Sequence, residues 1–278
     1  MCGIAGLYSL GTDRNKEEQA ALGRKLEQAI AHRGPDAADL WQDNRAPLTL
    51  CHRRLAIIDL SDDGRQPMHS HSGRYTITYN GEIYNYLVLR AELEAAGAEF
   101  KSQSDTEVML SAFEYWGIDQ ALQKINGMFA ICLWDQQENK LHFMRDRFGK
   151  KPLYIGWVKN DLVFSSELKS FHAHPDFDPK IDCDVLAQYM RYGYVQAPNC
   201  IFKNIWQMLP ASYVVLDLGS LNIGDNMAKK MKIFWSLKDV VKHGKSNILQ
   251  NEEACIIDEF EEKFQTAVSQ RMISDVPF

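Results

Sequence analysis

The sequence predicts an α+β fold in which antiparallel strands and helices occupy separate layers. Short apolar segments with strand-like pattern follow one another between residues 128 and 164, with turn residues between them. Helical periodicity occurs in other segments, including residues 16–32 and Asp105–Trp116. Runs of strands with helices grouped apart favour layered antiparallel sheets over a doubly wound parallel sheet.

The expected elements can be justified in chain order. Gly3–Ser9 is short and apolar, as in a buried strand. Residues 16–32 place apolar side chains at helical spacing, and Gly34-Pro35 ends that pattern. Residues 74–79 alternate aromatic or aliphatic side chains with threonines, which predicts a half-buried strand. Asp105–Trp116 is the second helix, and four strands are expected at residues 128–134, 140–145, 153–158 and 161–164.

The pattern changes after residue 171, where prolines and charges interrupt it. We expect a first domain over residues 1–217, a linker over 218–251, and the start of a second domain over 252–278. A last amphipathic helix is predicted within residues 252–273. Its apolar stripe needs a partner surface and comprises Ile256, Ile257, Phe260, Phe264 and Val268.

Composition excludes several classes of function. The 278 residues carry a net charge of −6, which argues against nucleic acid as a partner. No apolar run is long enough to span a membrane, and no secretory signal is visible at the N-terminus. The six cysteines and eight histidines show no metal-ligand spacing, so we expect no metal site. Reduced, scattered cysteines predict a cytoplasmic protein.

Cys2 is the residue that most directly suggests chemistry. If Met1 is removed, Cys2 carries a thiol and a free α-amine, and a model α-amine titrates near pH ~8. Such a residue can act as nucleophile and base at once. The alternative is that a cysteine merely happens to follow the initiator methionine.

Three further candidates each have a structural alternative. Asn80-Gly81 after an alternating strand is a strong hairpin signal, yet the same pair could supply two donors to an oxyanion. Arg54 precedes an apolar run that we expect to be a buried strand, and its guanidinium could bind a carboxylate or simply be solvated. Asp105 could receive a substrate ammonium, but Ser104 and Glu107 form a capping-box pattern that also explains this segment.

The order of these motifs carries more information than any one of them. The chain resembles the glutaminase domain of the glutamine-dependent asparagine synthetases, closely over about its first two-thirds. The motifs that carry the resemblance, in order, are Cys2-Gly3-Ile4, His32-Arg33-Gly34-Pro35-Asp36, Arg54-Leu55-Ala56-Ile57-Ile58-Asp59, Asn80-Gly81-Glu82-Ile83-Tyr84-Asn85, Ser104-Asp105, Arg145-Asp146-Arg147-Phe148-Gly149 and Ser165-Ser166-Glu167-Leu168-Lys169.

The resemblance implies an N-terminal-nucleophile fold, with two antiparallel sheets between helical layers, and a substrate, L-glutamine. It implies that Cys2 is the nucleophile and that Asn80 and Gly81 form the oxyanion hole. It further implies that Arg54 binds the α-carboxylate of glutamine, while Glu82 and Asp105 receive its α-ammonium. Backbone groups of Leu55, Ile57, Ile58 and Gly81 complete the implied glutamine site.

The resemblance also sets expectations for the whole protein. The family continues into an ATP-pyrophosphatase domain with a Ser-Gly-Gly-x-Asp-Ser loop, and residues 274–278 resemble the segment just before it. We therefore expect a truncated product or fragment, needing no cofactor for glutamine hydrolysis. ATP, Mg²⁺ and aspartate are expected only with the second domain, and a homodimer is left open. One departure is Pro210-Ala211-Ser212, where the family has a Pro-Pro-Gly-like turn.

Two other functions stay open at this stage. An amidotransferase of the same class could deliver ammonia to a sugar or another carboxylate. Alternatively, the chain could be a catalytically silent remnant that only binds a partner. Glutaminase activity would separate the two.

Overall fold

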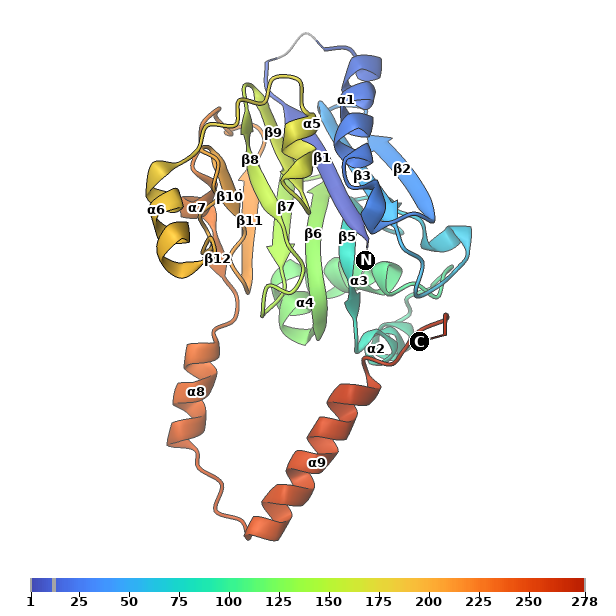
Figure 1. Cartoon of the computed structure of the whole chain (residues 1–278). Coiled ribbons are helices and arrows are strands. Elements are labelled where there is room, and N and C mark those ends of the chain that lie inside the picture. Colours follow the sequence, from blue (N-terminus) through green and yellow to red (C-terminus); the bar gives the residue numbers. More distant parts are fainter. Residues whose placement is uncertain (1, 12–13, 278) are drawn as a thin grey trace.

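The computed structural model describes residues 2–11 and 14–277. Two six-stranded antiparallel sheets pack face to face, and helices cover their outer faces (Figure 1). This arrangement confirms the predicted α+β sandwich.

The first sheet contains the N-terminal strand near its centre. Its strands run in the order β10-β8-β9-β1-β3-β2. Leu22 and Leu26 of α1 and Phe171 of α5 pack on its outer face. The bounds are β1 (Gly3–Ser9), β2 (Ala37–Gln42), β3 (Leu48–Arg54), β8 (Tyr154–Val158), β9 (Asp161–Ser165), β10 (Ile205–Gln207), α1 (Lys16–Gln28) and α5 (Lys169–Ala173).

The second sheet carries three helices on its outer face. Its strands run in the order β12-β11-β7-β6-β5-β4, with Val108 and Phe113 of α3 in the adjoining core. The bounds are β4 (Met68–His69), β5 (Tyr75–Ile83), β6 (Gly127–Asp135), β7 (Lys140–Arg145), β11 (Ser212–Asp217), β12 (Lys232–Ile233), α2 (Tyr86–Ala95), α3 (Asp105–Trp116) and α4 (Ile118–Lys124).

Apolar packing and buried hydrogen bonds join the two sheets. Phe143 and Phe164 meet edge to face across the interface, with ring centroids 5.1 Å apart. His52 Nε2 of β3 lies 3.1 Å from the carbonyl oxygen of Tyr79 in β5. The His52 contact joins β3 to β5, and β1 pairs with β3, so the N-terminus lies close to the strand that carries Asn80.

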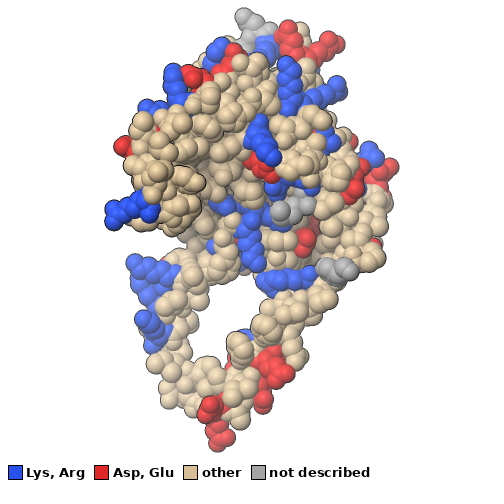
Figure 2. All heavy atoms as spheres, viewed as in Figure 1, with Lys and Arg blue, Asp and Glu red and all other residues tan. Residues whose placement is uncertain are grey.

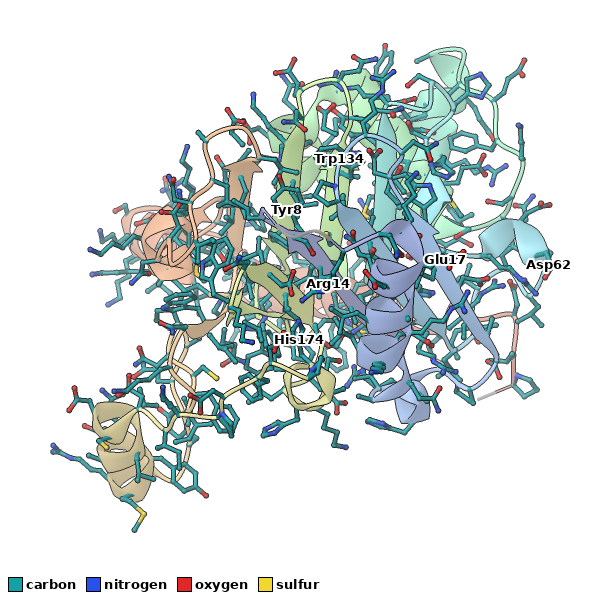
Figure 3. All side chains as sticks on the ribbon, turned by 90° about the horizontal axis from the view of Figure 1, so that it is seen from above. Tyr8, Arg14, Glu17, Asp62, Trp134 and His174 are labelled. Carbon is teal, nitrogen blue, oxygen red and sulfur yellow. The ribbon has the colours of Figure 1, made fainter. Side chains whose placement is uncertain are left out.

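A buried hydrogen-bond network around Asp161 links the end of β1 to the start of β9 in the first sheet. The carboxylate of Asp161 accepts hydrogen bonds from Ser9 and Arg14 and contacts His174 at 2.9 Å. Arg14 and His174 accordingly lie close together in Figure 3. Burial alone would raise the pKa of Asp161, but the hydrogen bonds from these three side chains lower it.

Three local predictions were wrong. The first expected helix is shorter, because α1 ends at Gln28 and a separate 3₁₀ turn, Ala31–Arg33, follows. Asn80-Gly81 is not a hairpin: neither residue has the positive φ that a type I′ turn needs, and β5 continues to Ile83. The apolar run after Arg54 is a loop and not a strand, since the guanidinium binds the carbonyl oxygens of Asp59 and Ser61 and curls the chain.

The predicted C-terminal helix is present as α9 (Glu253–Ser269), and its apolar stripe is exposed, with Phe260 68% accessible. It follows α6 (Cys183–Tyr192), α7 (Met227–Lys230) and α8 (Leu237–Ser246). Helices α8 and α9 project from the body (Figure 1), and Figure 2 shows basic side chains on α8 and acidic ones on α9. Among the described residues, no helix is both long and apolar enough to cross a membrane.

Candidate active site

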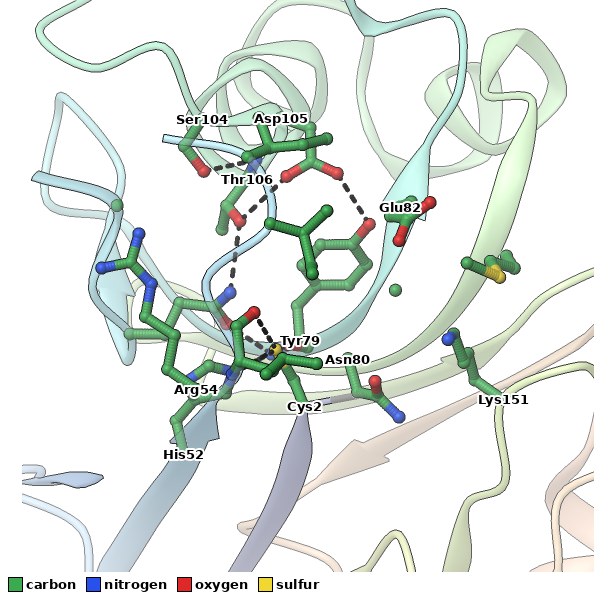
Figure 4. A pocket seen from close by; sticks show the side chains of 17 residues that line it. Cys2, His52, Arg54, Tyr79, Asn80, Glu82, Ser104, Asp105, Thr106 and Lys151 are labelled. Carbon is green, nitrogen blue, oxygen red and sulfur yellow. Dashed lines mark hydrogen bonds between the residues drawn. The ribbon is translucent and has the colours of Figure 1, made fainter. Parts of the chain in front are cut away.

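A cavity of about 350 Å³ opens where β1, β3 and β5 meet the start of α3 (Figure 4). Strand ends and two loops form its walls. Its lining includes every residue that the sequence predicted for glutamine chemistry, namely Cys2, Arg54, Leu55, Ile57, Ile58, Asn80, Gly81, Glu82 and Asp105. The structure therefore brings together residues that are up to about a hundred positions apart in the chain.

Cys2 lies immediately before β1 and presents its thiol to the cavity. Its Sγ is 3.4 Å from the amide nitrogen and 3.5 Å from the carbonyl oxygen of Leu55. Burial raises the pKa of the thiol, and the Leu55 amide acts in the opposite direction. Arg33 Nε donates to the carbonyl oxygen of Cys2 at 3.0 Å and so fixes its backbone. Met1 lies outside the described residues, so its removal stays a prediction.

Asn80 lines the same cavity as Cys2 and carries an unused donor. The side chain is 1% exposed, and its Nδ2 has no hydrogen-bond partner in the described part of the chain. A buried amide donor without a partner is costly unless a ligand satisfies it. This observation fits an oxyanion hole.

The backbone N–H of Gly81 is a second donor without a partner in the β5–β6 ladder. Gly81 lies opposite Phe129, whose amide and carbonyl are both bonded to Asp146 on the β7 side. Because hydrogen-bonding direction alternates along antiparallel strands, the Gly81 N–H points away from β6 and toward the cavity. Ile83, two residues on, shows this direction directly, since its N–H donates to Asp105 at 2.9 Å. A Cβ at position 81 would collide with the Met128 carbonyl, so glycine is required there.

Arg54 ends β3 and forms the cationic wall of the cavity. It donates to the carbonyl oxygen of Ser61 at 2.7 Å and to that of Asp59. Within the described residues no carboxylate forms an ion pair with it, which leaves it available to an anionic ligand. Neighbouring His52 does not compete, because burial lowers its pKa to about 3 and keeps the ring neutral.

Asp105 occupies the first position of α3 and faces the cavity from the side opposite Cys2 (Figure 4). Burial raises its pKa to about 6, although the Ile83 amide and the Tyr79 hydroxyl both donate to it. Burial also raises the pKa of Glu82, against the charge of Lys151. The two acidic groups thus form a wall that favours a cation.

The predicted capping box is only half formed. Ser104 caps α3 by accepting from the amide of Thr106 at 3.1 Å. Glu107 does not reach back to Ser104, because its carboxylate accepts instead from Ser102 and from the amide of Lys101. Helix capping therefore does not use the carboxylate of Asp105, which is left to the cavity.

Sequence reasoning missed Lys151, which also lines the cavity. Its backbone is fixed on both sides, by the Asp146 carboxylate at 3.0 Å and by Arg145 Nε at 2.8 Å. Burial lowers the pKa of its ammonium, while the charges of Glu82 and Cys2 raise it. The basic motif at residues 145–151 was the available signal, but it reads equally well as a charged turn.

The motif around Arg33 holds the backbone of Cys2 in place without lining the cavity. Glu167 Oε1 accepts from Arg33 at 2.8 Å and lies 3.0 Å from His32 Nε2. Through Arg33 this cluster reaches the carbonyl of Cys2 and does not line the cavity. Among the described residues no group of three or more His, Cys, Asp or Glu side chains is arranged to hold a metal ion.

Comparisons with solved structures support the fold. The chain aligns with glutamine phosphoribosylpyrophosphate amidotransferase from B. subtilis with a TM-score of 0.60 and 16% identity, over 84% of this chain and 49% of that one. A structure described as the allosteric regulatory enzyme of purine biosynthesis aligns with a TM-score of 0.62 and 17% identity, again over 84% and 49%.

Sequence comparisons are more specific. Asparagine synthetase [glutamine-hydrolyzing] 1 of Bacillus subtilis is 32% identical over 278 residues, which are 100% of this chain and 41% of that protein. Asparagine synthetase [glutamine-hydrolyzing] 3 of the same organism is 33% identical over 280 residues, 100% and 42% respectively. The chain thus spans less than half the length of these two relatives. A family model described as a glutamine amidotransferase domain matches residues 1–226, so the chain belongs to the glutamine amidotransferase domain family.

Proposed function

We propose that this chain hydrolyses L-glutamine to glutamate and ammonia with Cys2 as the nucleophile. The observation that carries the proposal is the buried, unpartnered Nδ2 of Asn80, a residue that lines the same cavity as Cys2. A donor preorganised for developing negative charge is the central requirement of amide hydrolysis through a tetrahedral intermediate.

The charges around the cavity match a free amino acid. Arg54 can bind an α-carboxylate with a bidentate geometry, and Asp105 with Glu82 can receive an α-ammonium. A zwitterion satisfies both walls at once. The side-chain amide of glutamine would then extend toward Cys2 and Asn80.

The reaction requires only groups of this chain and water. The α-amine of Cys2, once Met1 is removed, takes the thiol proton, and Sγ attacks the amide carbon of the substrate. Asn80 Nδ2 and Gly81 N–H stabilise the oxyanion, and the C–N bond breaks as the protonated amine passes its proton to the leaving nitrogen. Ammonia departs, and water then hydrolyses the glutamyl thioester to glutamate and restores the thiol.

For the whole protein we propose glutamine-dependent asparagine synthesis, with aspartate as the ammonia acceptor. The names of the relatives at 32% and 33% identity support this assignment. ATP and Mg²⁺ would then serve aspartate activation, while glutamine hydrolysis needs no cofactor. We further propose a cytoplasmic location, in which its six unpaired cysteines would stay reduced, and a homodimer is the assembly to test.

The experiment is release of glutamate and ammonia from glutamine by the purified chain, beside Cys2→Ala. Mass spectrometry of the N-terminus is measured on the same sample. We expect release that depends on Cys2 and on loss of Met1. A folded chain that has lost Met1 and yields no glutamate contradicts the proposal.

A further inference from the structure

The segment that follows α9 returns to the glutamine cavity. Asp275 Oδ2 accepts a hydrogen bond of 2.7 Å from the amide of Asp59, 216 positions earlier in the chain. The amide of Asp275 in turn donates to the carbonyl oxygen of Ile57 at 2.9 Å. Asp275 therefore holds the loop of residues 55–61 at two points. Ile57 and Ile58 of that loop line the cavity.

Asp59 is the residue through which this contact can act on the site. Its carbonyl oxygen accepts from Arg54, and its carboxylate accepts from the amides of Ser61 at 3.0 Å and Gln103 at 2.8 Å. Asp59 has a φ of 54°, a left-handed conformation that is uncommon for residues other than glycine, although aspartate tolerates it better than most. Such a conformation persists only where its surroundings hold it. The bond from its amide to Asp275 is one of those restraints.

From these contacts we propose that Asp275 is a positioning residue for glutamine: it fixes Asp59, which fixes the Arg54 guanidinium. This inference rests on the proposed function, because it assigns Arg54 to the substrate carboxylate. Asp275 itself does not line the cavity. Its effect must therefore pass through the loop.

Other contacts show that the end of the chain is seated here at more than one point. The Arg271 guanidinium lies over the Tyr84 ring at 4.4 Å from its centroid. Asn126 Nδ2 is 3.3 Å from Gln270 Oε1, and Ile273 packs against the core beneath the second sheet. Residues 270–275 thus form a docked strap, unlike the exposed α9 before them. Since coupling between two sites is reciprocal, glutamine binding should also tighten this strap.

The test compares Asp275→Ala with Asp275→Asn and with Asp258→Ala, a matched change at an exposed carboxylate of α9. Loss of a hydrogen bond to a loop that orders the ligand should raise KM for glutamine about three- to tenfold and leave kcat within about twofold. Asp275→Asn keeps an acceptor oxygen and should restore most of the affinity. Asp258→Ala should match the unaltered chain.

Hydrogen exchange at the Asp59 amide gives a readout that does not depend on turnover. Asp275→Ala should accelerate exchange at Asp59, and glutamine should slow exchange across residues 270–275 in the unaltered chain. An unchanged KM together with unchanged Asp59 exchange in Asp275→Ala overturns the inference. Absence of glutamine turnover in the unaltered chain would instead refute the proposed function. The role of Asp275 would then be decided by calorimetry, which compares glutamine binding to Cys2→Ala with and without Asp275→Ala.

Discussion

The hydroxyl of Tyr79 donates a 2.9 Å hydrogen bond to Oδ2 of Asp105, and both side chains are buried. The contact joins β5 to the first residue of α3, so the acidic wall of the cavity is fixed to the strand that carries Asn80 and Gly81. This bond favours the ionised carboxylate, whereas burial disfavours it. Burial is the stronger of the two effects and raises the pKa of Asp105 to about 6.

Tyr79→Phe removes this donor without changing the shape of the ring. Hydrogen bonds to charged groups contribute about 1.5–3 kcal/mol, so we expect KM for glutamine at pH 7 to rise roughly tenfold or more. The pKa of Asp105 should rise further, and the acidic limb of kcat/KM should move to higher pH. Rates measured between pH 5 and 8 check this, and an unmoved acidic limb would show that Asp105 does not control binding.

Asp105→Asn should stabilise the ligand-free chain while it abolishes glutamine binding. The pKa of Asp105 is raised to about 6 in the folded chain, against about 4 for an unfolded aspartate. The folded state therefore binds this proton more tightly, and the corresponding stability is complete below pH ~4 and is lost as pH rises through 6. Asparagine cannot ionise, so the variant should gain on the order of 1–3 kcal/mol at pH 8 and little near pH 4. Urea unfolding at both pH values tests this, with equal effects at each as the contrary result.

Asn80→Ala should slow turnover and leave the fold intact. Loss of one oxyanion-hole donor costs about 3–4 kcal/mol of barrier, or two to three orders of magnitude in kcat. Arg54 and Asp105 should still hold glutamine, so KM should change little. Because Asn80 Nδ2 has no partner in the described chain, the thermal midpoint should not fall markedly. Near-normal kcat in this variant would remove Asn80 from the proposed oxyanion hole.

Lys151→Met should make the Cys2 thiol harder to ionise. The Lys151 charge lowers the pKa of Cys2 against the effect of burial, and an opposite charge nearby favours the thiolate. We expect the pH profile of Cys2 alkylation by iodoacetamide to shift upward by roughly one pH unit or less. Lys150→Met, a change at the exposed neighbouring lysine, is the matched control. Identical profiles for the two variants would exclude an electrostatic role for Lys151.

Periodicity predicted the core elements well where one face of a segment is buried. The bounds Gly3–Ser9 and Asp105–Trp116 agree with β1 and α3, because apolar spacing and the Ser104 cap are encoded locally. Local signals failed where distant residues decide the backbone. Asn80-Gly81 has the composition of a turn, but its register against β6 keeps it extended, and the loop after Arg54 is shaped by the guanidinium itself.

The cavity could be assembled from sequence only through the order of its motifs. No local rule indicates that Arg54 and Asp105 line the same cavity, since tertiary packing brings them together. Lys151 was missed for the same reason: a lysine after a basic turn carries no sign that its side chain enters a cavity. Ala211 shows the opposite case. A glycine-like turn was noted there, and the residue indeed has a φ of 53°.

The projecting pair α8 and α9 is attached to the body at both of its ends. It leaves from β12, at one edge of the second sheet, and it returns through Asp275 to the loop of residues 55–61, which leads from β3 of the first sheet toward β4 at the opposite edge of the second. The pair is therefore anchored to the body at both ends, near opposite edges of the second sheet (Figure 1). A force on the pair would act on both attachments, at β12 and at Asp275. Only the attachment at Asp275 adjoins the cavity.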